Sequence, residues 1–556
     1  MRLPRERWPL VTTVLIVLIG SVFLLTQARH LWFFGDDWAF LLARDLGERP
    51  VESLMAPHNE HWSTVPVLIY RALYSVFGLH HFLVFAALPV AAHAVACVLL
   101  FLVQSRCGIH PWVSAGVTAV LVFLGAGAEN LLWSFQIGMI GTAVFGLAAL
   151  LLSAGWTGRR TVVIIWTLSV LSLMTASTSI PMLIWLGAFT FARHGLRRAL
   201  VLAVPPMIVY AAWFIVWGRQ AETGIPESRP VDVMPLAWKG LSVTWERMTG
   251  FEGVGPVLVI GLLTAALTLQ PDSARRALAL SGAATAVITY LILADSRGGL
   301  GPESTSPSRY SYFGALMLLP ALALVLHSLW DRLKTRRVEG SVALAAILGL
   351  LVIPGILGTV DFRVGRDTLT PDLRARTIAA SELARSSERL LDNAVDESYN
   401  PNITADALRL DSVAAALPDG PVTARDRLTA RAALQVSAAP TSWGLPEAVA
   451  TVEGTETSPS GDCSIGLGAV GSVLEIPSGR EGAQARLILS ETDRTTVRLR
   501  DGTVTSASVP MVVGDTSEVY VGVTAPGVGL LVDLPPGVPF TVCGRLDAGQ
   551  EDAIAP

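Results

Sequence analysis

Two adjacent carboxylates, Asp36 and Asp37, follow the first apolar run of the chain in the stretch FFGDDW. A carboxylate can take a proton from a hydroxyl group, and a neighbouring negative charge or partial burial raises its pKa and makes it a better base. Adjacent residues on a helix or strand do not share a face, so one acid could meet a substrate while the other holds the backbone or binds an ion. The next residues have helical apolar spacing, so either acid could instead be an N-cap.

A second polar segment, HNEHW, places His58, Glu60 and His61 within four residues. These groups could contribute ligands to a divalent ion such as zinc or manganese. The spacing differs from the helical zinc motif, in which two histidines stand four residues apart, and no fourth ligand is evident. Hydrogen bonding to a hydroxyl-rich or phosphorylated substrate is favoured, so no cofactor is certain and a divalent metal stays an alternative.

The stretch ENLLWSFQ contains Asn130, Trp133 and Gln136 at three-residue spacing. On a helix this spacing would place the two amides and the indole along one stripe. Polar groups within a membrane are candidates for function unless neighbouring helices satisfy them. The alternative is therefore an interhelical hydrogen bond without a ligand.

Several cations stand near the ends of later apolar runs. Arg309 and Tyr310 begin one such run, and Lys239 and Arg247 lie in a long polar stretch before it. A guanidinium fork is well shaped to bind phosphate. An arginine beside aromatic residues can also simply anchor a helix at the membrane interface, so both interpretations of Arg309 stay open.

The composition indicates that most of the chain faces lipid. Its 556 residues are 52% hydrophobic and 15% charged, with a mean hydropathy of +0.53, whereas soluble domains have about 25% charged residues. The net charge of −4 gives no hint of a nucleic-acid surface. A spanning helix needs roughly 20 apolar residues. The candidate spans are 9–28, 82–103, 111–127, 131–153, 161–177, 180–192, 198–217, 254–270, 277–295, 310–330 and 341–360.

The positive charges alternate between successive loops. The positive-inside rule therefore places the N-terminus in the cytoplasm and the C-terminus outside the plasma membrane. On this topology the acidic pair, HNEHW, Lys239 and Arg309 all fall on the extracytoplasmic side. The basic segments are Arg2, Arg5 and Arg7; Arg106; Arg159 and Arg160; Arg193, Arg197 and Arg198; Arg275 and Arg276; and Arg332, Lys334, Arg336 and Arg337.

The sequence predicts three regions. Residues 1–362 form a polytopic α-helical membrane domain of about eleven helices, with a long first outer loop at 29–81. Residues 363–449 form a helical or irregular extracytoplasmic linker. Short alternating runs such as SVLEI, TVRLR and VYVGV predict a mainly-β sandwich over 450–556. Cys463 and Cys543 flank this module, and export favours a disulfide between them over two buried thiols.

The acidic pair after the first span, the partly helical first outer loop, the roughly eleven spans and the exported C-terminal domain together resemble the GT-C superfamily of integral-membrane glycosyltransferases. The resemblance covers the chain to about residue 360, and Asp36-Asp37 carries it most specifically, followed by Arg309-Tyr310. The arginine-rich composition and the β module are most similar to the actinobacterial cell-wall glycosyl- and arabinofuranosyltransferases, whose C-terminal domains are carbohydrate-binding sandwiches.

This resemblance implies an inverting transfer from a polyprenyl-phosphate sugar to a glycan or other cell-envelope acceptor on the extracytoplasmic face. The expected partners are that donor, a glycan acceptor and membrane lipid, but no nucleic acid. Asp36 is the preferred base because family members tend to use the first acid of the pair, with Asp37 the close second. The expected donor- or substrate-binding residues are His58, Glu60, His61, Asn130, Trp133, Gln136, Lys239, Arg309 and Tyr310.

Two other classes of protein stay open. A transporter or flippase of lipid-linked glycans would need ionisable residues deep within the spans, and the span interiors hold almost none. A non-catalytic membrane scaffold would bind glycan through the β module alone, and its acidic pair would be dispensable.

Overall fold

The computed structural model of the chain contains two compact units, each described by itself. The helical unit comprises Met1–Leu31, Arg44–Val76 and His81–Asp367, and the mixed unit comprises Trp32–Ala43, Phe77–His80 and Thr368–Pro556. The structure describes residues 7–42, 44, 49–155, 158–221, 224–269, 273–333, 337–387, 390–391, 393–396, 398–439, 451–453, 457–460, 463–478, 483–489, 495–511, 518–523 and 527–543.

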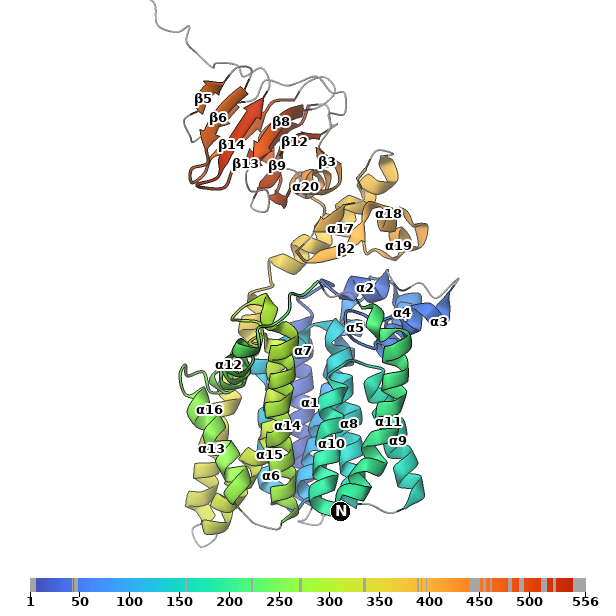
Figure 1. Ribbon diagram of the computed structural model, residues 1–556, viewed down its shortest axis with the longest axis vertical. Helices are drawn as coiled ribbons and strands as arrows, with labels where there is room; N and C mark the ends of the chain where they lie inside the picture. The colour runs from blue at the N-terminus through green and yellow to red at the C-terminus, as the bar shows by residue number, and fades with distance from the viewer. Residues whose placement is uncertain are drawn as a thin grey trace, which may run out of the picture. The chain divides into compact units, whose positions relative to one another are not determined.

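The helical unit is built from α-helices and short 3-10 helices (Figure 1). They are α1 (Trp8–Ala28), α3 (Pro50–Met55), α4 (Thr64–Phe77), α5 (Phe82–Arg106), α6 (Pro111–Val122), η2 (Gly125–Gly127), α7 (Ala128–Leu132), η3 (Ser134–Gln136), α8 (Ile137–Gly155), α9 (Arg159–Leu173), α10 (Ser179–His194), α11 (Leu196–Val216), η4 (Gly218–Gln220), α12 (Pro230–Thr249), α13 (Gly255–Thr268), α14 (Ala274–Arg297), η5 (Gly298–Leu300), α15 (Ser308–Arg332) and α16 (Arg337–Val364).

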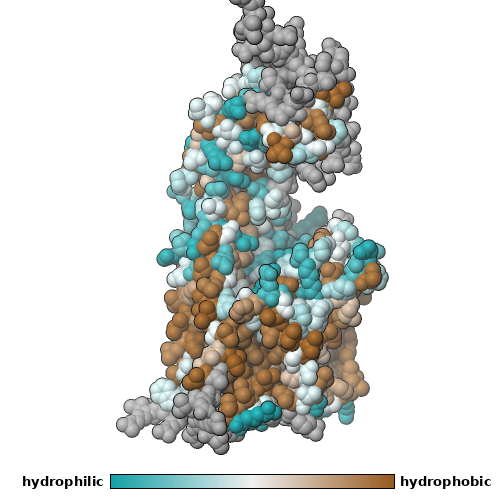
Figure 2. Space-filling view, turned by 90° about the vertical axis from the view of Figure 1, so that its left-hand side faces the viewer, coloured by the Kyte–Doolittle hydropathy of each residue, from teal (hydrophilic) through white to brown (hydrophobic). Residues whose placement is uncertain are grey.

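The apolar helices of this unit have the length and composition of a multi-pass membrane domain. Within the described ranges, seven helices are long and apolar enough to cross a bilayer, or eight if the bent pair Pro111–Val122 and Gly125–Leu132 is one span. α15 is central, with 78% of its most apolar window buried, whereas α1 and α11 have 28% and 22%. Figure 2 shows the side of the helical unit on which α13 and α16 lie, and the surface there is largely apolar.

Each of the eleven predicted spans contains a helix, but not every helix is long enough to cross alone. α9, α10 and α13 have 15, 16 and 14 residues, whereas a perpendicular span needs roughly 20. The uncertain stretch 161–192 divides into α9 and α10, which are separate helices. The predicted number of helices therefore holds, and the number that are membrane-length is smaller than expected.

The predicted basic turns meet at one end of the helical unit, where Figure 1 also marks the N-terminus. The ends of α5, α8 and α10 and the adjoining ends of α6, α14 and α15 touch there. The contacts are Arg106 against Gly155, His194 Nε2 to Ser153 O (3.3 Å), the His110 N–H to His327 Nδ1 (3.0 Å) and Arg275 against Gly108. Arg2, Arg5, Lys334 and Arg336 lie outside the described residues. The side of the membrane that this end faces stays a prediction.

The opposite end is shaped by a bend between α6 and α7. Gly125 in η2 lies so close to Gly355 of α16 that a Cβ on either would collide with the other segment's backbone. Gly127 packs in the same way against Tyr312 of α15. Small residues allow membrane helices to approach this closely. The bend consequently sets the short helix α7, with its polar residues, beside the beginning of α15.

The mixed unit contains the acidic segment, a group of helices, a small hairpin and a β-sandwich. Its helices are α2 (Asp37–Leu41), α17 (Leu369–Ser386), α18 (Ala405–Arg409), α19 (Asp411–Ala416) and α20 (Ala424–Gln435). Its strands are β1 (Ala394–Asp396), β2 (Asn400–Thr404), β3 (Val436–Ala439), β4 (Thr451–Glu453), β5 (Thr457–Ser460), β6 (Cys463–Leu467), β7 (Val473–Ile476), β8 (Ala483–Leu489), β9 (Thr496–Asp501), β10 (Val504–Thr505), β11 (Val509–Pro510), β12 (Glu518–Val523), β13 (Gly529–Asp533) and β14 (Pro539–Cys543).

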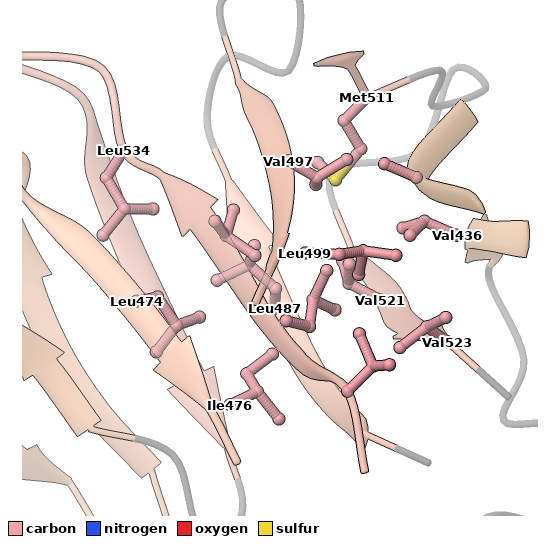
Figure 3. Close-up of a cluster of buried hydrophobic side chains, with 14 of the residues drawn as sticks. Val436, Leu474, Ile476, Leu487, Val497, Leu499, Met511, Val521, Val523 and Leu534 are labelled. Carbon is pink, nitrogen blue, oxygen red and sulfur yellow. The ribbon is translucent and has the colours of Figure 1, made fainter. Parts of the chain in front are cut away.

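The sandwich has two antiparallel sheets, ordered β10-β9-β13-β7-β4 (with β11 beside β9) and β3-β12-β8-β14-β6-β5. Alternation in β9 turns Val497 and Leu499 inward, where they join Leu487 and Val521 in the core drawn in Figure 3. The expected start at residue 450 is too late. β3 begins at Val436, and α20 supplies two further core residues, so the helical linker is continuous with the sandwich.

The strand register brings the two cysteines of the sandwich together. Cys463 on β6 is directly opposite Cys543 on β14. Directly opposed residues of antiparallel strands have Cα atoms about 4.5–5.5 Å apart, which is within the range of disulfides. The disulfide stays a prediction, with a backbone register that suits it.

Candidate functional site

The second acid of the pair closes the turn on which both acids stand. Asp37 is fully buried, and its Oδ2 accepts a hydrogen bond from the Phe34 N–H at 3.2 Å. The Asp37 N–H donates to the Phe34 carbonyl at 3.4 Å. Gly35, between them, has a φ of 60°, a conformation that glycine adopts without strain. Asp37 therefore holds the backbone.

The first acid is placed differently. Asp36 is half-buried at the position before α2, and its side chain makes no capping hydrogen bond to that helix. The alternative of a simple N-cap consequently lacks the hydrogen bond that defines it. The two acids are thus placed differently: Asp37 closes the turn, and Asp36 does not cap α2.

Aromatic side chains on both sides of this acidic turn pack against one another. The ring of Trp32 lies 5.7 Å from Phe33 and 5.4 Å from Trp38, in edge-on contacts typical of aromatic pairs. All three residues are buried. The turn also joins the β1–β2 hairpin, because the Gly35 N–H donates to the carbonyl of Tyr399. The acidic turn is therefore bonded to the rest of the mixed unit through this hairpin.

In the helical unit, HNEHW forms a tight β-turn. The backbones of His58 and His61 exchange two hydrogen bonds of 2.9 Å, and Asn59 has a φ of 49°. Asparagine tolerates this left-handed conformation better than most residues. The ring of His58 lies 5.3 Å from Phe135, so the turn is held against the segment between α7 and α8.

The charged residues of this turn contact two other helix ends. Glu60 forms an ion pair with Arg297 at the end of α14. His61 Nδ1 lies 2.6 Å from the Ser177 Oγ and 3.4 Å from its N–H. Because a backbone N–H can only donate, Nδ1 acts as the acceptor, which leaves the ring proton on Nε2, 3.9 Å from Glu60 Oε1.

The contacts of HNEHW give no support to a metal site. No three His, Cys, Asp or Glu side chains in the described ranges are grouped so that they could hold an ion. Glu60 instead forms an ion pair with Arg297, and His61 forms a hydrogen bond with Ser177. Arg297 was not among the predicted site residues, since nothing in its local sequence distinguishes it from an interfacial anchor.

Arg309 is held at the polar end of the bundle by Glu129 of α7. Its Nη1 lies 2.7 Å from Glu129 Oε1, and its backbone N–H donates to Oε2 at 3.1 Å. Ser308 Oγ lies 3.3 Å from the Glu129 N–H and donates to the Ala126 carbonyl at 2.9 Å. The Arg309 side chain is 36% exposed and that of Glu129 11%. The pair is thus fixed, with its cation accessible.

Tyr310 lies under the same cation, with the guanidinium carbon of Arg309 5.0 Å from its ring centre. A guanidinium stacked on an aromatic face is held by its ring and retains donors at its edge. The predicted Arg309-Tyr310 pair therefore acts as one group in the structure.

Two further cations of α12 lie near this group. Lys239 Nζ is 2.5 Å from Glu303 Oε1, and this hydrogen bond lowers the pKa of Glu303. Arg247 donates to the carbonyl of Ser306. Burial lowers the pKa of Arg247, and the charges of Glu129 and Glu303 act in the opposite direction. Arg247 Nη1 also lies 3.4 Å from the Ser311 Oγ, two residues after Arg309 on α15.

Asn130, Trp133 and Gln136 do not form the predicted helical stripe. α7 ends at Leu132, Trp133 is extended with a ψ of 117°, and Gln136 ends the separate helix η3. The break nevertheless brings the amides together, with Asn130 Nδ2 3.3 Å from Gln136 Oε1. Both side chains are buried. This is the hydrogen bond that the non-ligand alternative expects, although it joins neighbouring short helices instead of two spans.

One intramembrane residue was not predicted from the sequence. His93, within α5, is 2% exposed, and its Nδ1 lies 3.0 Å from the Tyr312 hydroxyl. Its Nε2 lies 3.4 Å from the carbonyl of Val122, where α6 ends. His93 therefore ties α15 to the bend that carries α7. A single histidine inside an apolar run gives no periodic signal by which it could be found.

Comparisons with known proteins add one likeness. No family model matches the chain, and no curated protein matches it. The chain is similar to the crystal structure of ArnT from Cupriavidus metallidurans bound to undecaprenyl phosphate, with 14% identity and a TM-score of 0.45 over 72% of this chain and 87% of that chain. A likeness of this size assigns neither a family nor an activity.

Proposed function

We propose that the chain is an integral-membrane inverting glycosyltransferase. It would move a sugar from a polyprenyl-phosphate donor to a glycan or other cell-envelope acceptor on the extracytoplasmic face. The proposal combines the sequence resemblance to the GT-C superfamily with two features of the structure. These are an acidic turn that Asp37 closes while Asp36 does not cap α2, and an accessible, fixed arginine at the polar end of a membrane-type bundle.

The observation that carries the proposal is that the side chains of Asp36 and Asp37 are placed differently. The Asp37 carboxylate accepts a hydrogen bond from the Phe34 N–H, whereas Asp36 is half-buried and makes no capping hydrogen bond to α2. A sugar hydroxyl is a poor nucleophile near neutral pH, and a positioned carboxylate that accepts its proton accelerates attack by about 10²–10⁴-fold. Asp36 is the residue of the pair that can take this role.

In the proposed reaction, the acceptor oxygen bonds to the anomeric carbon as its proton passes to the Asp36 carboxylate. The bond from the anomeric carbon to the phosphate oxygen breaks, and polyprenyl phosphate leaves as an anion. This leaving group needs positive charge and no general acid. Arg309, with its Tyr310 support, would bind that phosphate, and Arg247 and Lys239 would add to the local positive potential.

Other predicted site residues receive different roles. Asn130, Trp133 and Gln136 would shape the segment that carries Glu129, and HNEHW would hold helix ends together. The region after residue 367 would present the acceptor. Residues 450–556 contain two aromatic residues, Tyr520 and Phe540, and Phe540 is in the core.

The test uses the full chain in lipid nanodiscs with a panel of synthetic polyprenyl-phosphate pentoses and hexoses as donors and methyl glycosides as acceptors. We expect at least one pair to yield a new glycoside together with free polyprenyl phosphate. The Asp36→Asn variant should yield neither. A donor panel that gives no product with the wild-type chain would contradict the proposal.

A transporter of lipid-linked glycans is the second candidate, and His93 is the observation that favours it. Ionisable residues within spans are often part of transport pathways. Both ring nitrogens of His93 have packing partners in the bundle, however, and this favours a structural role. Proteoliposomes would decide: a transporter moves the intact lipid-linked sugar across the bilayer, and His93→Gln abolishes that movement.

A further inference from the structure

The β1–β2 hairpin of the mixed unit lies against the acidic turn. α2 packs on β2, and the Gly35 N–H donates to the Tyr399 carbonyl at the beginning of β2. These segments are more than 350 residues apart in the sequence, so their contact is a feature of the tertiary structure. The hairpin is therefore the immediate neighbour of Asp36 and Asp37 within this unit.

The hairpin turn is built to hold that carbonyl in place. Asp396 Oδ1 accepts hydrogen bonds from the N–H groups of Ser398 and Tyr399, at 3.0 and 2.9 Å. Its Oδ2 accepts from Arg376 of α17 at 3.1 Å. The side chains of Arg376 and Asp396 are 20% and 14% exposed, so this pair is largely sheltered from solvent. The docking point of the acidic turn is consequently fixed to α17.

The next residue, Asn400, is fully buried, and its side-chain amide makes no hydrogen bond to a described residue. The indole N–H groups of Trp32 and Trp38, on both sides of the acidic turn, are buried and lack such partners too. Buried polar groups are nearly always satisfied, because an unpaired one costs its full desolvation penalty. Three unsatisfied residues beside a proposed base indicate polar groups held ready for a ligand.

We propose that Asn400 is a binding residue for the acceptor, and that the β1–β2 hairpin completes the acidic site. This inference rests on the proposed function. An amide presents donors and an acceptor together, and a hydroxyl group does the same, so Asn400 is matched to a neutral hydroxyl-bearing molecule. A sugar with neighbouring hydroxyls can bond the amide through one and present another to Asp36.

Both polar atoms of the Asn400 amide are closed off from solvent. Binding at Asn400 therefore requires a movement that opens this site. The acceptor reaches these atoms by displacing the acidic turn from β2, which breaks the backbone hydrogen bond between Gly35 and Tyr399. The polar groups left unpaired in the empty site are then satisfied by the acceptor.

The experiment compares Asn400→Leu, of similar volume, with Asn402→Leu two residues further along the same strand. The full chain in nanodiscs is assayed with the donor panel and increasing methyl glycoside, and its midpoint of thermal unfolding is measured without substrate. We expect Asn400→Leu to raise the acceptor KM about 5- to 30-fold. Its unfolding midpoint should not fall, because the amide that is removed is unpaired in the empty protein. Asn402→Leu should leave both quantities unchanged.

Three outcomes overturn the inference. One is an unchanged acceptor KM in Asn400→Leu, and the second is a lower unfolding midpoint that accounts for the lost activity, which would make Asn400 structural. Should the leucine variant fail to fold, Asn400→Ala removes the amide without adding bulk, and an acceptor KM equal to that of the wild type in this variant would be the third. Asp36→Asn separates the two proposals: if it is inactive while Asn400→Leu is normal, only the role of Asn400 is wrong.

Discussion

The first outer loop contains two tight turns, FFGDDW and HNEHW, that look alike in the sequence and differ in the structure. Each has carboxylates and one residue at positive φ, Gly35 in the first and Asn59 in the second. In HNEHW the charged side chain of Glu60 is paired with Arg297, and His61 bonds Ser177. In FFGDDW one acid closes the turn and the other does not cap its helix.

The difference shows how a polar motif at the edge of a membrane domain can be assigned either to a structural role or to a chemical one. A turn whose glutamate pairs with one helix end and whose histidine bonds another can stabilise the bundle. A turn in which one acid closes the backbone and the other does not cap the following helix is the one that we propose for chemistry. We therefore assign HNEHW to architecture and FFGDDW to the reaction, and each of the following predictions can break that assignment.

The largest effect is expected for Asp36→Asn. Loss of a general base lowers the rate by about 10²–10⁴-fold, and the unfolding midpoint should stay near that of the wild type. Asp37→Ala should instead lower the midpoint, because it removes the hydrogen bond to Phe34. The measurement is transfer rate alongside thermal unfolding for both variants. Equal activity in Asp36→Asn and the wild type would reverse the assignment.

Arg309→Ala should have the next largest effect. Charge-assisted hydrogen bonds are worth about 1.5–3 kcal/mol, so the donor KM should rise about 10- to 100-fold. Arg309→Lys keeps the charge and should recover part of the affinity, since it loses only the fork geometry. Titration with decaprenyl phosphate checks binding without turnover. Unchanged binding by the alanine variant would remove Arg309 from the phosphate site.

For the other turn, Glu60→Gln and Arg297→Gln should act on stability. The pair is partly sheltered, with side chains 35% and 14% exposed, so we expect a loss of about 1–3 kcal/mol, between the values for exposed and buried pairs. Activity per folded molecule should change little. If Glu60→Gln were inactive but as stable as the wild type, HNEHW would belong to the reaction.

The smallest effect is expected at the two positive-φ residues. Gly35→Ala and Asn59→Ala each place an alanine in a left-handed conformation, at a cost of about 1–2 kcal/mol. Gly35→Ala should also slow transfer because it moves Asp36, whereas Asn59→Ala should affect unfolding alone. Asn59→Gly serves as the strain-free control. Equal loss of transfer in both alanine variants would show that the two turns are not functionally distinct.

Much of the fold follows from patterns that are local in the sequence. Apolar runs identify most of the long helices, because burial in lipid acts on each run separately. They do not identify α12, whose 20 residues lie in a stretch that the sequence presents as polar. The alternation of Val497, Arg498 and Leu499 identifies a strand for the same reason. The bend between α6 and α7 is not predicted, since it depends on the close approach of Gly125 to Gly355, which lies far away in the sequence.

The candidate site is predictable in part. The residue types of Asp36 and Arg309, and their positions beside apolar runs, are enough to suggest chemistry. The partners of such residues are not evident from the sequence, because Glu129 lies 180 residues from Arg309 and Arg297 lies 237 residues from Glu60. Asn400 could not be predicted either, since an unsatisfied buried amide exists only once the chain is folded.

The stereochemistry of transfer tests the central claim most directly. The full chain in nanodiscs is given one active donor and its acceptor, and the products are followed by NMR. The proposed mechanism predicts a glycoside of inverted anomeric configuration and polyprenyl phosphate in equal amounts, both absent with Asp36→Asn. Retained configuration, or undiminished product from Asp36→Asn, would contradict it.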